Sequence, residues 1–173
     1  MLETLKEILI HLWDELKPAY IVNEYEGAVL LHLGKYKRTD GPGLHWKIPL
    51  IEETIVTSMA VTTAQPGSQS LMTKDDQKVV INTVVKYNVK DVKPYLLEIE
   101  DRDDVLTDVV MGAVREVVRE SAFNELDEAD NKIKKKVRSE VGRYGFKIHD
   151  VTIVDVSPIE TMRLMHDGII IGE

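Results

Sequence analysis

The recurrence of apolar or β-branched residues at every second position over 79–89 is the strongest constraint that this sequence places on its fold. Every second position is apolar or β-branched, namely Val79, Ile81, Thr83, Val85, Tyr87 and Val89. Asn82, Lys86 and Asn88 lie between them, together with Val80 and Val84, and Lys78 and Lys90 flank the stretch. Because successive side chains of a strand point to opposite faces, the pattern predicts a long strand with one buried face. Asp75 and Asp76, just before it, favour a hairpin turn.

Two helical patterns follow, and each offers an apolar face that can contribute to a core. One spans about residues 103–123, where apolar side chains recur at helical spacing and Asp103 or Asp104 can cap the first turn. It is rich in valine, which has a low helix propensity, so tertiary burial must stabilise it. The other spans about 127–144, with Asp127 as its N-cap.

Further strand patterns occur before and after this central region. Alternating apolar residues bounded by glycine turns mark three earlier stretches, at about residues 29–33, 44–48 and 52–63. A polar loop at 64–70 separates them from the long strand. Gly145 is the expected C-cap of the second helix, and residues 146–156 predict one more strand. Its apolar phase slips near His149 and Asp150, which indicates a β-bulge.

Residues 1–17 have the spacing of an amphipathic helix, which Pro18 ends. The apolar stripe of this helix consists of Leu2, Leu5, Ile8, Leu9, Leu12, Trp13 and Leu16. The stripe suits a membrane interface, where full burial of each such side chain is worth roughly 1.5–3 kcal/mol. It also suits packing on its own domain or on a neighbouring subunit, and its acidic polar face disfavours tight binding to anionic lipid. Both interpretations stay open.

Composition narrows the classes of function. The net charge of −8 disfavours binding to nucleic acid, because phosphate backbones repel acidic proteins. The lack of cysteine excludes disulfides and thiolate metal sites. No apolar run reaches the roughly 18 residues of a transmembrane helix, and the N-terminus does not resemble a secretory signal. We therefore expect a protein on the cytoplasmic side.

The residue types that carry chemistry form no catalytic or metal-binding pattern. The five histidines show no paired-ligand spacing, although His32 and His45 lie on neighbouring strand patterns. No serine occupies a nucleophile elbow, and no phosphate-binding glycine loop is present. The aspartates at 101–108 lack calcium-loop spacing and fit a capped helix start. We expect no enzymatic activity, no cofactor and no bound metal.

Several short motifs occur in an order and at spacings that are specific when taken together. Residues 27–36 (GAVLLHLGKY) precede 41–49 (GPGLHWKIP), and 72–75 (MTKD) lead into the long strand. Residues 160–162 (ETM) follow the last strand. Over roughly 20–166 the chain resembles the SPFH domain of the stomatin, prohibitin and band 7 family. The resemblance implies an α+β fold with a β-rich first subdomain and an αβ second subdomain.

The expected organisation combines these patterns with the resemblance. It comprises an amphipathic helix, a β-rich SPFH subdomain, an αβ SPFH subdomain and a short helix with an apolar tail, over residues 1–18, 19–66, 67–157 and 158–173. Members of the family usually carry a membrane hairpin or helix before the domain and a coiled coil after it. In this sequence an amphipathic helix occupies the position of the membrane segment, and the sequence stops at Glu173 without a coiled-coil pattern.

The resemblance implies a non-enzymatic, self-assembling, membrane-associated scaffold that organises membrane microdomains or regulates membrane proteins such as proteases. We expect a homo-oligomer that binds the membrane surface peripherally through its N-terminal helix. The alternative is a soluble oligomeric interaction module, in which the N-terminal helix and the C-terminal tail are assembly arms.

Two sets of residues are candidate functional sites. The membrane-contact set joins the N-terminal stripe to a tryptophan of the 41–49 region, because tryptophan favours membrane interfaces: Leu2, Leu5, Ile8, Leu9, Leu12, Trp13, Leu16 and Trp46. The oligomer-interface set combines acids of the first central helix with lysines of the second: Asp101, Asp104, Asp108, Lys132, Lys135 and Lys136.

Overall fold

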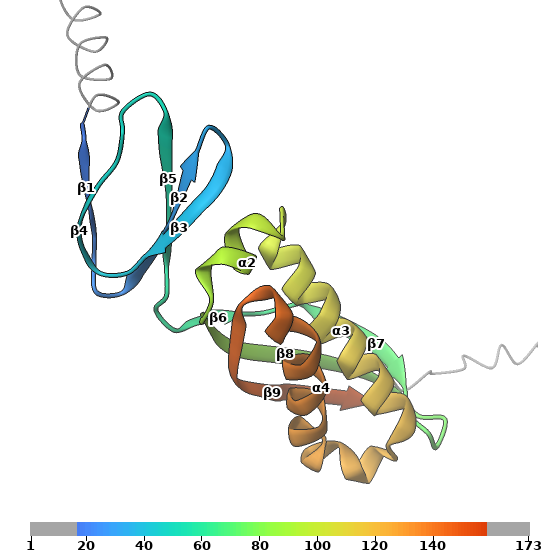
Figure 1. Ribbon diagram of the computed structural model, residues 1–173. Helices are drawn as coiled ribbons and strands as arrows, with labels where there is room; N and C mark the ends of the chain where they lie inside the picture. The colour runs from blue at the N-terminus through green and yellow to red at the C-terminus, as the bar shows by residue number, and fades with distance from the viewer. Residues whose placement is uncertain (1–16, 159–173) are drawn as a thin grey trace, which may run out of the picture.

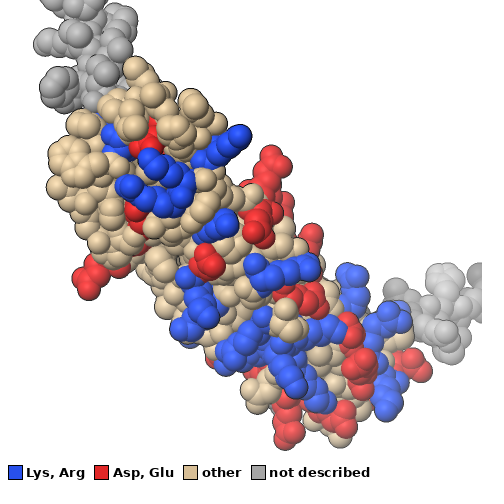
Figure 2. All heavy atoms as spheres, viewed as in Figure 1, with Lys and Arg blue, Asp and Glu red and all other residues tan. Residues whose placement is uncertain are grey.

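A computed structural model describes residues 17–158 of the 173-residue chain. The molecule is elongated, with an all-strand subdomain at one end and a mixed subdomain at the other (Figure 1). Charged side chains of both signs crowd the mixed subdomain, whereas uncharged atoms cover most of the all-strand subdomain (Figure 2). The expected α+β class is confirmed. The predicted N-terminal helix and C-terminal tail lie outside the described residues.

The first subdomain is built around one buried strand. Its strands are β1 (Ala19–Val22), β2 (Glu26–His32), β3 (Lys35–Asp40), β4 (Gly43–Trp46) and β5 (Glu52–Ser58). β2 lies between β3 and β5 in an antiparallel sheet, and β1 pairs with β4 in a separate ribbon. Residues 28–31 of β2 are all buried, so side chains on both faces of this strand enter the interior.

One predicted strand is two strands in the structure. The pattern over 52–63 indicated a single strand, but its last part forms β6 (Thr62–Ala64), which pairs with β8 (Lys78–Val89) in a different sheet. The Asn88 side-chain amide fixes the crossing between the sheets by donating to the Met59 carbonyl oxygen at 3.1 Å. Alternation did not reveal the change of sheet because the apolar phase continues through the crossing.

β8 is the central strand of the second sheet. β6 and β7 (Ser68–Met72) pair with one of its edges, and β9 (Phe146–Pro158) pairs along the other. The alternation of β8 is confirmed, since all of its predicted core residues are buried. β9 has the predicted bulge at His149 and a second one at Val154. Asp76, at φ 61°, lies in the turn between β7 and β8.

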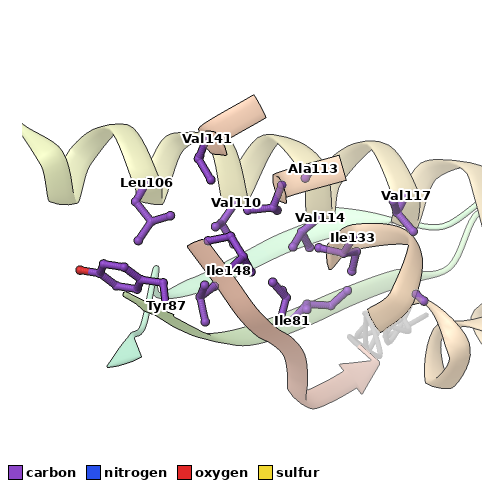
Figure 3. Packing of buried hydrophobic residues seen from close by; sticks show 14 of the residues in the cluster. Ile81, Tyr87, Leu106, Val110, Ala113, Val114, Val117, Ile133, Val141 and Ile148 are labelled. Carbon is purple, nitrogen blue, oxygen red and sulfur yellow. The ribbon is translucent and has the colours of Figure 1, made fainter. Parts of the chain in front are cut away.

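Helices cover the core-facing side of this sheet. Between residues 17 and 158 the helical segments are α2 (Val92–Leu97), α3 (Arg102–Glu120), η1 (Phe123–Glu128), α4 (Asp130–Val141) and η2 (Gly142–Tyr144), where η marks a 3₁₀ segment. α3 and α4 bury their apolar stripes against β8 and β9, as Val114, Ile133 and Ile81 show (Figure 3). The valines of α3 are thus held by burial, as the sequence predicted.

The helix starts differ from the predicted ones. The N-cap position of α3 is Asp101, and the predicted caps Asp103 and Asp104 lie in its first turn. α4 begins at Asp130 rather than after Asp127, because the 3₁₀ segment η1 occupies the preceding residues. The two acids in the first turn of α3 still favour the helix, since carboxylates interact well with the positive end of the helix dipole.

A small second core joins the two subdomains. Val29 and Leu31 of β2 pack with Val89 and Val92 near the start of α2. Gly27 lies directly against this contact, since a Cβ there would come within 2.5 Å of Val92 Cγ2. The joint holds the first subdomain so that its far loops lie away from α3 and α4 (Figure 1).

Candidate functional site

The far end of the first subdomain displays a group of large apolar side chains to solvent. This end of the subdomain consists of the turn between β2 and β3, the loop between β4 and β5, and the start of β1 (Figure 1). The Lys47 N–H ties β4 to the start of β1 by donating to the Pro18 carbonyl oxygen at 2.8 Å. We call this region the loop end. Its exposed apolar residues are Leu33, Trp46, Ile48, Leu50 and Ile51.

Two leucines of the loop end adopt an unusual backbone conformation. Leu33 and Leu50 have φ angles of 49° and 66°, and they are 72% and 81% exposed. A left-handed conformation costs a leucine of order 1–2 kcal/mol. A side chain left in water gains little from packing to offset that cost. Strained, exposed apolar residues are typical of sites that contact another molecule.

A buried carboxylate supports the loop that carries Leu50. The Glu52 side chain is only 2% exposed, and it accepts hydrogen bonds from the Lys37 ammonium and, at 2.8 Å, from the Ile48 N–H. His32 Nδ1 lies 3.3 Å from the same carboxylate. The hydrogen bonds from Lys37, Ile48 and His32 outweigh burial and lower the pKa of Glu52 to about 2. The carboxylate is therefore ionised near neutral pH, and it holds the loop through its hydrogen bond from the Ile48 N–H.

A second buried carboxylate, Asp40, supports the ribbon of β1 and β4. The Tyr20 hydroxyl donates to it, Arg38 Nε donates to its two oxygens at 2.8 and 3.0 Å, and His45 Nδ1 lies 3.6 Å away. Burial acts to raise the pKa of Asp40, but the hydrogen bonds from Tyr20 and Arg38 lower it overall. The Arg38 guanidinium also donates to the Trp46 carbonyl oxygen at 3.0 Å, which positions that residue at the loop end.

The outer face of the ribbon extends the apolar surface away from the loop end. Ile21 and Leu44 lie directly opposite each other in the register of β1 and β4, and both are exposed. Trp46, two residues further along β4, shares their face and is 66% exposed. Tyr20 and His45 occupy the inner face, where their rings lie 5.6 Å apart. Ile21, Leu44 and Trp46 therefore point to solvent, whereas Val22 of the same ribbon is buried.

Trp46 is the residue of the predicted membrane-contact set that the structure describes. The N-terminal stripe from Leu2 to Leu16 lies outside the described residues. Sequence reasoning missed Leu33, which fitted the phase of a predicted strand, and Leu50, which follows the proline at the end of another. The available signal was a leucine beside a turn-forming glycine or proline at each position.

The predicted oligomer-interface residues occupy different parts of the helical layer. The three aspartates of the set are exposed along the first half of α3, next to α2. Lys132 and Lys135 are exposed near the start of α4, at the opposite end of the layer (Figure 1). Lys136 instead bonds to Glu116 of α3, and this hydrogen bond raises the pKa of Lys136. Within residues 17–158, no aspartate of the set pairs with a lysine of the set.

The histidines of the first subdomain serve separate clusters. His32 faces Glu52, whereas His45 faces Asp40 and lies 2.7 Å from the Gly41 carbonyl oxygen. In the described part of the chain, no group of three or more histidines or acids is placed to hold a metal ion. Between residues 17 and 158, no helix has the length and apolar character needed to cross a membrane.

The fold and this surface define a class of protein: a two-part α+β module that presents strained apolar loops on a rigid, hydrogen-bonded base. The SPFH domain / Band 7 family model matches residues 20–165. The chain belongs to this family, which confirms the resemblance seen in its motifs.

The chain is also similar to several proteins of archaea and bacteria. An uncharacterised protein of Archaeoglobus fulgidus is 31% identical over 83% of this chain and 59% of its own length. A stomatin homolog of Pyrococcus horikoshii is 28% identical over 86% of this chain and 56% of its own length. Protein HflK of Vibrio cholerae is 32% identical over 62% of this chain and 27% of its own length. The chain thus spans a little over half of two of these relatives and about a quarter of the third.

Proposed function

We propose that this SPFH domain is a non-enzymatic, self-assembling scaffold that lies peripherally on a membrane surface. In this proposal the loop end and the N-terminal stripe contact the bilayer, and the helical subdomain contacts neighbouring copies. The observation that carries the proposal is the pair of exposed leucines, Leu33 and Leu50, held at positive φ over the buried Glu52 carboxylate.

The chemistry of the loop end suits a bilayer interface. Each large apolar side chain that leaves water contributes roughly 1.5–3 kcal/mol, and the loop end offers several of them on one surface. Tryptophan is enriched at the level of lipid headgroups, which is where Trp46 would lie beside the inserted leucines. Because the loops are already fixed by hydrogen bonds, little ordering entropy opposes their insertion.

Assembly would strengthen this contact. A single loop end and a single stripe are weak anchors, but linked copies bind a surface with far greater avidity. The oligomer-interface set supplies opposite charges on α3 and α4, which a neighbouring copy can bring together. The scaffold would corral or regulate membrane proteins, with a protease as one class of partner, as the resemblance to the stomatin and prohibitin family implies.

Liposome flotation of the whole chain tests the membrane contact. Three variants separate its parts: Leu33→Glu with Leu50→Glu for the loop end, Leu5→Glu with Leu12→Glu for the stripe, and Val154→Glu as a control. Val154 is exposed in the second subdomain, so its substitution places one glutamate, against two in each double variant, away from the proposed contact.

We expect the wild-type chain and the control to float, and each double variant to float less. Flotation that is unchanged in the loop-end variant would refute that part of the proposal. If the wild-type chain assembles but does not float at all, the domain is instead the soluble interaction module that the sequence left as the alternative.

A further inference from the structure

A hollow opens between the two strained leucines of the loop end. Its volume is about 410 Å³, and it lies where the turn after β2 meets the loop before β5. Its lining combines apolar and charged residues: Leu33, Gly34, Lys47, Leu50, Ile51, Glu52 and Glu53. A Cβ at Gly34 would meet no atom within 4 Å, so a ligand has room to approach the backbone here.

The charge of the loop end is opposite to that of the whole chain. At and beside the loop end, three lysines, Lys35, Lys37 and Lys47, stand against two acids, Glu52 and Glu53, whereas the chain as a whole carries −8. Figure 2 shows basic side chains gathered on the upper subdomain, where uncharged atoms predominate and a few acidic side chains are also visible. A locally positive surface on an acidic protein concentrates anions there.

The cations of the loop end differ in whether an acid already holds them. Lys37 is bound to Glu52, so these two charges neutralise each other. Among residues 17–158, neither Lys35, next to Gly34, nor Lys47, in the lining of the hollow, has an ion pair. Glu53 is the exposed acid of the lining, and its charge opposes anion binding. Two ammonium groups are thus available beside the apolar residues.

We infer that the loop end recognises the phosphate groups of anionic phospholipids, with Lys35 and Lys47 as the headgroup contacts. This inference rests on the proposed membrane contact and names the class of lipid. Leucines inserted at the boundary between headgroups and acyl chains place these lysines at the depth of the phosphates. The negative potential of an anionic leaflet then attracts each lysine, an effect that falls off within a Debye length.

The test compares binding of the full chain to two kinds of vesicle, pure phosphatidylcholine and phosphatidylcholine in which about a fifth of the lipid is phosphatidylglycerol. The variant Lys35→Gln with Lys47→Gln removes the proposed contacts. The variant Lys86→Gln with Lys147→Gln removes the same charge from exposed positions of the second subdomain. Glu53→Gln removes the opposing acid.

We expect the wild-type chain to prefer the anionic vesicles, and added salt to reduce the preference. Loss of Lys35 and Lys47 should weaken binding to anionic vesicles about fivefold per lysine, with little change on neutral vesicles. The control variant, Lys86→Gln with Lys147→Gln, should weaken binding to anionic vesicles by less than half as much. Glu53→Gln should bind anionic vesicles more tightly than the wild-type chain does.

Equal binding of the wild-type chain to both kinds of vesicle would overturn the inference and leave the proposed membrane contact standing. An equal loss in the two lysine variants would also overturn it, since the preference would then follow total charge. If the chain binds neither kind of vesicle, the proposed membrane contact itself fails.

Discussion

The backbone N–H of Leu33 donates a hydrogen bond to the carbonyl oxygen of Ile51 across 2.9 Å. This bond joins the turn after β2 to the loop before β5, so the two segments that display strained leucines form one structural unit. The Ile48 N–H, bound to the buried Glu52 carboxylate, anchors the same loop from inside. The apolar surface of the loop end is therefore preformed, and contact with a partner requires little rearrangement.

Replacement of Leu50 by asparagine should separate stability from binding. Asparagine tolerates the left-handed conformation, so Leu50→Asn should keep the stability of the wild-type chain or raise it by up to about 1 kcal/mol. The same substitution removes an inserting side chain and should reduce liposome flotation. Urea denaturation gives the first quantity. A variant that unfolds at clearly lower urea would show that Leu50 packs within the chain.

The Glu52 carboxylate should make stability depend on acid pH. The hydrogen bond from Lys37, with those from Ile48 and His32, lowers its pKa in the folded chain from the ordinary value of 4.5 to about 2. The stability that it contributes is therefore present above pH 4.5 and is lost as the pH falls toward 2.

Urea midpoints of the wild-type chain and of Glu52→Gln, measured across this pH range, test that expectation. The difference between the two midpoints should shrink as the pH falls. Glu53→Gln is the matched control, since it removes an exposed carboxylate from the adjacent residue. A difference that stays constant with pH would mean that the ionised form of Glu52 has no special role.

Substitution of Gly27 should destabilise the joint between the subdomains. A Cβ at this position would meet Val92 Cγ2 at 2.5 Å and Met59 Sδ at 2.9 Å. Overpacking of this kind costs about 1–3 kcal/mol, so Gly27→Ala should lower the free energy of unfolding by that amount. Gly112→Ala is the control, because open space surrounds that position inside α3 and alanine favours helix by about 1 kcal/mol. Thermal unfolding should move in opposite directions for the two variants.

Charge reversal should reveal whether α3 and α4 meet between copies. Asp104→Lys and Lys135→Asp each place like charges together if those residues pair across an interface, so each variant should lower the assembled mass in sedimentation. The combined variant restores opposite charges and should recover it. Because the two residues lie at opposite ends of one helical layer, recovery would indicate neighbours that are offset along it. Single variants that assemble normally would exclude this pairing.

The sequence predicted the second subdomain well because its elements obey simple periodicity. Ile81 and Val85 mark the buried face of β8, and the phase slip at His149 identified a real bulge. The β-rich region was less predictable. Its strands are short, and the crossing near Met59 preserves the apolar phase while the chain changes sheets.

The loop end could be predicted only in part. Trp46 was predicted as a contact residue from its type, since tryptophan favours interfaces, and the structure shows that it is exposed; its membrane contact stays a prediction. Leu33 and Leu50 were not, because a neighbouring glycine or proline is only a weak sign of the left-handed backbone that both leucines adopt. The ion pair between Lys37 and Glu52 could not be predicted either, since the two residues are distant in sequence and meet only through the pairing of β2 with β3 and β5.

The fluorescence of Trp46 in the presence of vesicles tests the central claim most directly. Trp13 is the other tryptophan, so Trp13→Phe leaves Trp46 as the sole reporter while keeping an apolar side chain in the stripe. We predict that vesicles shift its emission to shorter wavelength, and that lipids brominated near the headgroup end of their chains quench it. Leu33→Glu with Leu50→Glu should abolish both effects. Emission that stays unchanged while the chain floats would contradict membrane contact by the loop end and assign the binding to another part of the chain.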